Sequence, residues 1–383
     1  GSTVRQATLI QPAPEPPEPA VNDLRPDANE FVSDRFARSM ANTSDRERFD
    51  VGVDLYSAPD FAGGLVITGD NVAMKIGGFV KADFIYDFDP IDNTDAFDTT
   101  TIPVGAEPRT NSRYHARQTR LSFDTHWMTS ERTVRIFVEG DFFSDSDRYR
   151  LRHAYGESGP LLVGQTWTTF TDVAAAPSTL DFEGSVSSVN RRQAQARWTP
   201  EMVLHEDVTW AISIEDSREI FRLPPELSGD LRTPSPDFVG RVRLEREWGQ
   251  FQVAGLYRVL GFQPDDSDML TANGWGLNFT GVVLLTDSSK VYSQIVFGEG
   301  IGSYRGLPDA VPSGPQSLAI LPIFGWMIGV THEWTDLLSS NVTYAENRLF
   351  NTDFQDGDDV RRTTYLAANL IWNPLERVRV GVE

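Results

Sequence analysis

The chain alternates between apolar and polar residues from about Val72 to its last residue. In Met74–Tyr86 the even-numbered positions are Met, Ile, Gly, Val, Ala, Phe and Tyr, whereas the odd-numbered positions include Lys75, Lys81 and Asp83. Successive side chains of a β-strand point to opposite faces, so one face of such a strand is apolar and the other is charged. The same two-residue period recurs in Gln118–Trp127, Val134–Asp141, Arg148–Tyr155 and Arg377–Glu383. The pattern predicts a succession of strands, with Tyr149, Leu151 and Tyr155 on an apolar face.

Short and long connections alternate between these strands. Short turns such as Met128–Glu131 and Trp248–Gln250 alternate with segments rich in Asp, Gly, Pro and Ser. The longer segments are Phe88–Arg113, Thr171–Asn190, Ser217–Pro236, Gly261–Leu270, Gly300–Leu318 and Asn351–Asp359. Short periplasmic turns and longer outer loops are typical of an outer-membrane β-barrel. The short connection Ser144–Asp147 is an exception among the outer loops.

The strand count supports one large barrel over residues 71–383. Counting gives ~15 strands, whereas single-chain bacterial barrels have even numbers. We therefore expect an all-β, transmembrane antiparallel barrel of about 16 strands in the full protein, with the last strand missing after Glu383. A soluble sandwich or propeller is the alternative, but nothing repeats at the length of a propeller blade.

Residues 1–70 differ from the rest of the chain. They contain the proline-rich tract Gln11–Pro19, which favours extended backbone and cannot form a packed core. We expect a largely irregular N-terminal periplasmic extension. It is either a disordered tail without a role or a spacer or arm that contacts other subunits.

Composition agrees with a barrel and excludes several other classes. The mean hydropathy of −0.32 is too low for a bundle of transmembrane helices. Five tryptophans lie at predicted strand ends beside short turns and are expected to form a girdle: Trp127, Trp198, Trp248, Trp334 and Trp372. The chain has no cysteine, which excludes disulfides and thiolate sites. Its net charge of −21 argues against a nucleic-acid partner.

Alternation places a set of basic side chains on the face that would line a water-filled lumen. The predicted pore-lining residues are Lys75, Lys81, Arg120, Arg135, Arg148, Arg150, Arg152, Arg197, Arg241 and Arg243, with Arg191 and Arg258 on the same face. Arginine suits carboxylate solutes because its planar guanidinium binds them through two hydrogen bonds. Alternatively, these residues pair with lumen carboxylates and stiffen the wall; the candidates are Asp83, Asp124, Glu139, Asp141 and Glu245.

Several runs resemble one family of barrels. They are Glu139–Phe143, Arg150–Glu157, Gly164–Asp172, Leu180–Gly184 and Arg192–Trp198. Together they are similar to the DcaP-like outer-membrane porins, over roughly Met74–Glu383. The resemblance implies a 16-stranded homotrimeric porin in the outer membrane of a Gram-negative bacterium, which passes small, often anionic solutes such as dicarboxylates. The sequence departs from the family in lacking a closing strand and in having a proline-rich N-terminus without clear heptads.

The third outer loop is the expected constriction. In porins of this architecture the loop after the fifth strand folds into the barrel, and here it contributes Asp172, Asp181 and Glu183. An acidic loop opposite an arginine wall would create a transverse field in the pore. Outer-membrane lipid and lipopolysaccharide are the expected surroundings.

No constellation in the sequence suggests catalysis. The five histidines occur in no metal-ligand spacing, and no nucleophile elbow or phosphate-binding loop is present. We therefore expect no enzymatic activity, no metal and no cofactor. The competing functions are a structural or adhesive barrel with a plugged lumen and, less favoured, an outer-membrane enzyme.

Overall fold

The computed structural model describes residues 65–68 and 71–383, apart from 145–146, 201–204, 206, 226, 266, 315, 354, 358 and 376. The predicted N-terminal extension therefore lies outside the described residues up to residue 64. Within the described part of the chain, no helix is both long and apolar enough to cross a membrane.

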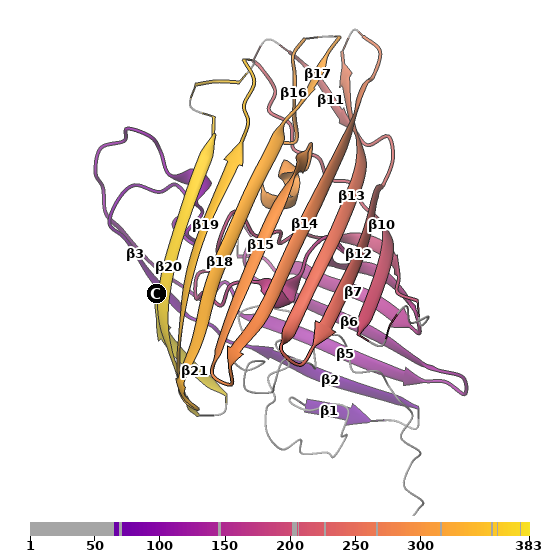
Figure 1. The fold of residues 1–383 in the computed structure, drawn as a ribbon, viewed down its shortest axis with the longest axis vertical. Helices are drawn as coiled ribbons and strands as arrows, with labels where there is room; N and C mark the ends of the chain where they lie inside the picture. The colour runs from indigo at the N-terminus through magenta and orange to yellow at the C-terminus, as the bar shows by residue number, and fades with distance from the viewer. Residues whose placement is uncertain are drawn as a thin grey trace, which may run out of the picture.

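Most described residues belong to one 17-stranded sheet (Figure 1). Its strands are β1 Leu65–Thr68, β2 Val72–Phe79, β5 Arg120–Met128, β6 Thr133–Asp141, β7 Arg150–Ser158, β8 Leu161–Trp167, β9 Arg192–Trp198, β10 Val208–Glu215, β11 Gly229–Arg232, β12 Asp237–Arg246, β13 Gly249–Pro264, β14 Leu270–Thr286, β15 Ser289–Glu299, β18 Pro322–Thr335, β19 Leu338–Leu349, β20 Arg362–Leu375 and β21 Val378–Val382. Neighbouring strands are antiparallel throughout. The predicted all-β fold is confirmed.

The connections between the strands contain two short hairpins and three 3-10 turns among the described residues. The hairpins are β3 Asp83–Asp87 with β4 Asn111–His115 and β16 Ala310–Pro312 with β17 Leu318–Ile320. The 3-10 turns are η1 Thr99–Thr101, η2 Val173–Ala175 and η3 Gly302–Arg305. Each of these turns contains at least one buried residue, so their connections do not simply extend into solvent.

Two local features explain why the sheet contains more strands than the sequence count. Strand β1 pairs with the free edge of β2, so pairing begins ahead of residue 71, the predicted start of the barrel. Strands β11 and β12 both pair with β13 and occupy one position in the sheet. Pro234 and Pro236 lie between them, and a proline has no N–H to donate to the ladder. The interruption therefore divides one strand position into two strands.

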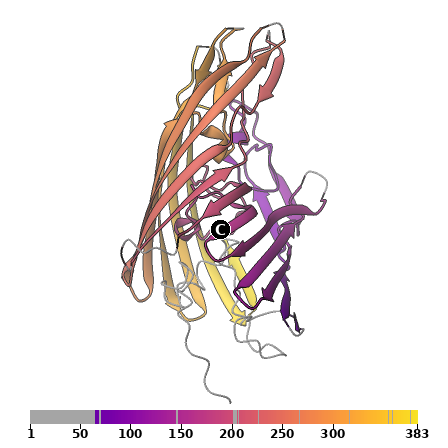
Figure 2. The same cartoon turned by 90° about the vertical axis from the view of Figure 1, so that its right-hand side faces the viewer.

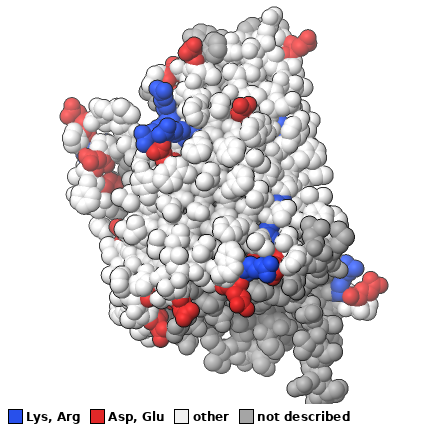
Figure 3. Space-filling model, in the orientation of Figure 1, with Lys and Arg blue, Asp and Glu red and all other residues white. Residues whose placement is uncertain are grey.

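The sheet is apolar outside and polar inside, as a membrane barrel requires. On β13, Phe251, Val253 and Tyr257 are exposed, whereas Gln250 and Gln252 are buried on the inner face. Figure 3 shows a broad, mainly uncharged surface over the long strands, with most charged residues above and below it. The five predicted girdle tryptophans are between 42% and 60% exposed.

The barrel has a tall wall and a low wall. Strands β13 and β14 contain 16 and 17 residues, whereas β8 and β9 contain seven each. Figures 1 and 2 show the long strands, coloured orange and red, as one steep curved wall, with the shorter magenta strands crossing on the other side. Loop segments between the two walls narrow the interior.

A bulge in β7 changes which face its residues occupy. Glu139 pairs with His153 and Gly140 pairs with Leu151, so Arg152 is the extra residue. Arg152 and His153 are consequently both buried, and the alternation inverts after them. Tyr155 then shares a face with Phe137, whose ring it contacts at 5.6 Å between centroids. The prediction that Tyr155 lies on the same apolar face as Tyr149 and Leu151 is wrong because the bulge is not visible in the sequence pattern.

Candidate functional site

The third loop, Thr171–Asn190, enters the barrel and is anchored at its base by Asp172. The carboxylate accepts hydrogen bonds from Arg243 Nη2 at 2.7 Å and from Thr280 Oγ1 at 2.6 Å. It also accepts from Gln250 Nε2 at 3.1 Å and caps η2 through Ala174 N at 3.1 Å. These partners come from β12, β13 and β14, so Asp172 ties the loop to the tall wall. All of these hydrogen bonds end on the Asp172 carboxylate, which is 0% exposed and therefore not available to a solute in the lumen.

The tip of the loop is held by polar and charged side chains of Lys81, Asn369 and Glu383. Lys81 Nζ donates to the carbonyl oxygen of Leu180, and it also pairs with Asp83 at 3.1 Å. The carboxylate of Glu383 accepts from Leu180 N at 2.8 Å and from Asp181 N at 3.0 Å. Asn369 Nδ2 donates to Ser178 O at 2.7 Å. The loop therefore crosses the lumen and is fixed at its base and at its tip.

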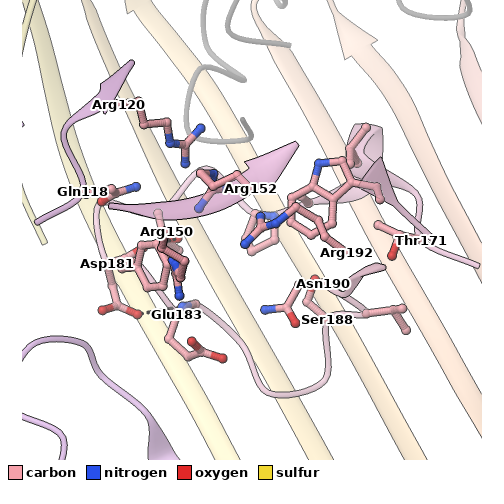
Figure 4. A pocket seen from close by; sticks show the side chains of 18 residues that line it. Gln118, Arg120, Arg150, Arg152, Thr171, Asp181, Glu183, Ser188, Asn190 and Arg192 are labelled. Carbon is pink, nitrogen blue, oxygen red and sulfur yellow. Dashed lines mark hydrogen bonds between the residues drawn. The ribbon is translucent and has the colours of Figure 1, made fainter. Parts of the chain in front are cut away.

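A cavity of about 220 Å³ lies between this loop and the low wall. Arg120, Arg150 and Arg152 line one side of it, on β5 and β7. The other side is lined by residues of the third loop, among them Asp181, Glu183, Ser188 and Asn190 (Figure 4). The structure thus brings together, around one cavity, three of the predicted arginines and two of the three predicted loop carboxylates.

The three arginines share two carboxylates. Arg150 binds Asp141 through two hydrogen bonds of 2.9 and 2.8 Å. Arg152 contacts the same carboxylate at 2.8 Å and Glu139 at 3.2 Å, and Arg120 approaches Glu139 at 3.5 Å. The predicted alternative, in which these arginines pair with lumen carboxylates, is therefore observed. It leaves this cluster with one more cation than anions.

Asp181 and Glu183 both line the cavity, but their carboxyl groups have different hydrogen-bond partners. Asp181 accepts hydrogen bonds from Phe97 N of the Phe88–Arg113 loop at 2.8 Å and from Gly184 N of its own loop at 2.7 Å, so its carboxylate is bound by the backbone of two loops. Burial raises its pKa, and these two backbone hydrogen bonds oppose that effect. Burial also raises the pKa of Glu183 to about 7, and repulsion from Asp98 and Asp181 adds to this, while Asn190 and Arg150 oppose it. Glu183 is thus poised to change charge near neutral pH.

The remaining predicted pore-lining residues lie away from this cavity. Arg135 pairs with Asp124 and Glu157, each at 2.9 Å, and Lys75 is opposite Asp124 in the β2–β5 register. Arg197 and Arg241 are partly exposed on β9 and β12. Arg148 precedes β7 and is exposed, so it does not continue the arginine row of that strand.

Two features of the site escaped the sequence reasoning. Arg192 also lines the cavity and lies 4.4 Å from the centroid of the Trp167 ring, whereas alternation had selected Arg191 and Arg197. The sixth loop, Gly300–Leu321, also folds inward, because Ile301, Tyr304 and Leu307 are buried against the third loop's Val186 and Val189. The three-residue spacing of Ile301, Tyr304 and Leu307 was the available signal, since it marks one face of a helical turn.

Among the residues that the structure describes, no three His, Asp or Glu side chains are grouped so that they could hold a metal ion.

Comparison with known proteins agrees with this fold. The family model described as DcaP outer membrane protein matches residues 53–216. The crystal structure of the outer membrane channel DcaP of Acinetobacter baumannii is similar, with a TM-score of 0.73 and 20% identity, over 82% of this chain and 90% of that one. No curated protein matches the sequence.

Two further solved structures share the fold at lower similarity. An anion-selective porin from Comamonas acidovorans has a TM-score of 0.55 and 9% identity, over 81% of this chain and 87% of that one. Salmonella typhi OmpF in complex with daunomycin has a TM-score of 0.55 and 8% identity, over 83% of this chain and 91% of that one. The predicted resemblance to DcaP-like porins and the outer-membrane location are confirmed, and the chain is a porin-like outer-membrane channel.

Proposed function

We propose that this channel passes small anionic solutes, of the size and charge of dicarboxylates, by passive diffusion. The observation that carries the proposal is that four arginines line this one cavity: Arg120, Arg150, Arg152 and Arg192. Guanidinium groups remain charged at all physiological pH values and bind a carboxylate through paired hydrogen bonds. Arg150 and Arg192 are the two of these four that are partly exposed, and they are the ones that a solute with two carboxylates would contact.

Local charge favours this selectivity despite the acidic chain as a whole. The net charge of −21 is spread over the sequence, including the Asp-rich first and seventh outer loops. Four arginines line the cavity, whereas Glu139 and Asp141 are the carboxylates that pair with them. The two loop carboxylates that also line it, Asp181 and Glu183, have raised pKa values because they are buried, which favours their neutral forms. Arg150 keeps 36% of its side chain exposed and is therefore within reach of a passing solute. In a narrow passage, nearby charges outweigh distant ones because salt screens beyond about 10 Å.

The proposal predicts an anion preference that depends on Arg150 and Arg152. In a planar bilayer with a salt gradient, the wild-type protein should conduct in steps with a reversal potential of the anion-selective sign. Replacing both arginines by alanine should lower the anion-to-cation permeability ratio about fivefold or more, since one unit charge at 4 Å in water is worth ~1 kcal/mol. The exposed Arg232→Ala, whose side chain pairs with Asp230, is the matched control.

The outcome that contradicts the proposal is a cation preference that the double substitution leaves unchanged. Asp141 is fully buried and loses its partners in the double variant, so folding must be checked. Arg150→Gln is the milder variant because Arg152 still pairs with Asp141. A folded protein that never conducts in steps would instead favour a structural or adhesive barrel.

We further propose that three copies of the chain assemble through the low wall. A transmembrane strand needs about 9–11 residues to cross the bilayer, and β8 and β9 have seven. A wall of such strands is better covered by protein than by lipid, whereas the tall wall suits contact with lipid and lipopolysaccharide. Light scattering in detergent should give the protein mass of a trimer, and a monomer at the concentrations that conduct would contradict the assembly.

A further inference from the structure

The sixth loop forms a wedge between the tall wall and the third loop. Its turn η3 carries Tyr304 and Arg305, both buried, and Figure 1 shows this short orange coil inside the curve of the long strands. On its apolar side, Ile301 and Leu307 belong to one core cluster with Phe170, Val186 and Val189 of the third-loop region. Gly276 leaves the space that Ile301 fills, because a Cβ there would lie 2.6 Å from Ile301 Cδ1. The wedge therefore touches both its wall and the third loop.

The wedge is fixed to the wall through Arg258. This fully buried side chain of β13 donates to Ser303 Oγ at 2.9 Å and to Asp309 Oδ1 at 3.2 Å, both in the sixth loop. Tyr304 adds a hydrogen bond to Asp237 of β12 at 2.7 Å. The barrel wall thus holds η3 through buried hydrogen bonds, in addition to the packing of η3 against the third loop.

Arg305 transmits that position to the third loop. Its guanidinium donates to the carbonyl oxygen of Ser187 at 2.7 Å and also to that of Val186. Gly325 makes room for it, since a Cβ there would overlap the Arg305 guanidinium. Gln294 of β15 supports the same segment, donating to Ser187 O at 2.6 Å. The residues on either side of this contact, Gly184 and Ser188–Asn190, line the cavity.

We propose that Arg305 is a positioning residue for conduction, which holds the third loop from behind and so fixes the width of the cavity on the side opposite the arginines. Arg305 itself does not line the cavity, so its effect on solutes is exerted through the backbone of Val186 and Ser187. On this proposal, selectivity by charge and selectivity by size depend on different residues. The arginines of the low wall control the first, and the sixth-loop wedge controls the second. The inference rests on the proposed function only in taking this cavity as part of the conducting path.

The test compares Arg305→Met and Arg305→Lys with the exposed control Arg232→Met. In Arg305→Met the loop loses two charge-assisted hydrogen bonds but keeps the one from Gln294, so displaced loop conformers should become about tenfold more frequent. Single-channel records should show closures and sub-conductance states about tenfold more often, with an unchanged reversal potential. Arg305→Lys should fall between wild type and Arg305→Met, since an ammonium group offers its donors from one point.

A second readout does not depend on conduction. The chain has no cysteine, so a single Asn190→Cys substitution reports on the cavity by its rate of modification with a charged thiol reagent in detergent. That rate should rise about tenfold when Arg305→Met is added. Folding of each variant is verified by its heat-dependent gel mobility.

Unchanged rates of closure and of thiol modification at position 190 in folded Arg305→Met would overturn the positioning role. If the wild-type protein does not conduct at all, the proposed function fails, and the thiol modification rate still decides whether Arg305 holds the loop. If Arg305→Met does not fold, Arg305→Lys carries the same comparison, and its failure to differ from wild type would overturn the proposal.

Discussion

Replacing Arg258 by methionine is expected to lower the free energy of unfolding by about 3–5 kcal/mol, the usual cost of removing one partner from a buried ion pair. Arg258, Asp237 and Asp309 are each 0% exposed, and Arg258 contacts both carboxylates at 3.2 Å. Methionine fills much of the volume of the arginine side chain but leaves the buried carboxylates of Asp237 and Asp309 without the cation that pairs with them. The loss should also release the sixth loop, because Ser303 and Gly300 lose a donor.

The destabilisation should depend on pH. Burial raises the pKa of Asp309 even with Arg258 beside it, and removing the cation raises it further. Between the unfolded pKa of about 3.9 and this higher folded value, the folded variant holds a proton that the unfolded chain has released. Stability of the variant therefore falls as pH rises through that window. The defect should be smaller near pH 5 than near pH 8.

The loss of stability is measured by thermal unfolding at the two pH values, with the folded fraction monitored by the gel mobility of heated samples. Arg232→Met, which removes a surface pair with 53% of the arginine side chain exposed, should unfold within a degree or two of wild type. Adding Asp309→Asn to Arg258→Met should recover part of the loss by removing one stranded charge. If the Arg258→Met protein is as stable as the control at both pH values, the ion pairs of Arg258 with Asp237 and Asp309 contribute nothing to the stability of the fold.

Raising the pH from about 6 to about 8 is expected to weaken the anion preference of the channel about fivefold, because one negative charge appears beside the arginines. The group responsible is Glu183, whose pKa burial and its acidic neighbours raise to about 7. Below that value Glu183 is neutral and the cavity is dominated by Arg120, Arg150 and Arg152. Above it, the carboxylate offsets one of them.

The substitution Glu183→Gln isolates this effect. It should hold the permeability ratio at its low-pH value across the range, whereas Asp98 and Asp181, which face the same carboxylate, remain in place. Histidine side chains in general change charge in the same pH range, and the same variant controls for them. A pH dependence that persists undiminished in Glu183→Gln would assign the titration to another group.

The two-residue alternation by itself determined the fold and the orientation of most side chains. A strand has only two faces, so a local count of apolar and polar positions decides which residues face lipid and which face the lumen. This is why the barrel, the outward orientation of the tryptophans beside short turns, and the inward Arg120, Arg150 and Arg152 could be predicted. Prolines and bulges break the count locally, and Tyr155 was misassigned because nothing in the pattern marks the extra residue in β7.

Only the tertiary structure decided what each inward side chain meets. Asp172 was predicted to face the lumen with Asp181 and Glu183, yet it binds Arg243 and anchors the loop. Lys81 meets Leu180 across 99 residues of sequence, and Arg305 meets Ser187 across 118. Contacts of such separation depend on how far two loops enter the lumen and where they stop. That depth is set by packing and buried hydrogen bonds among distant segments, which no local periodicity encodes.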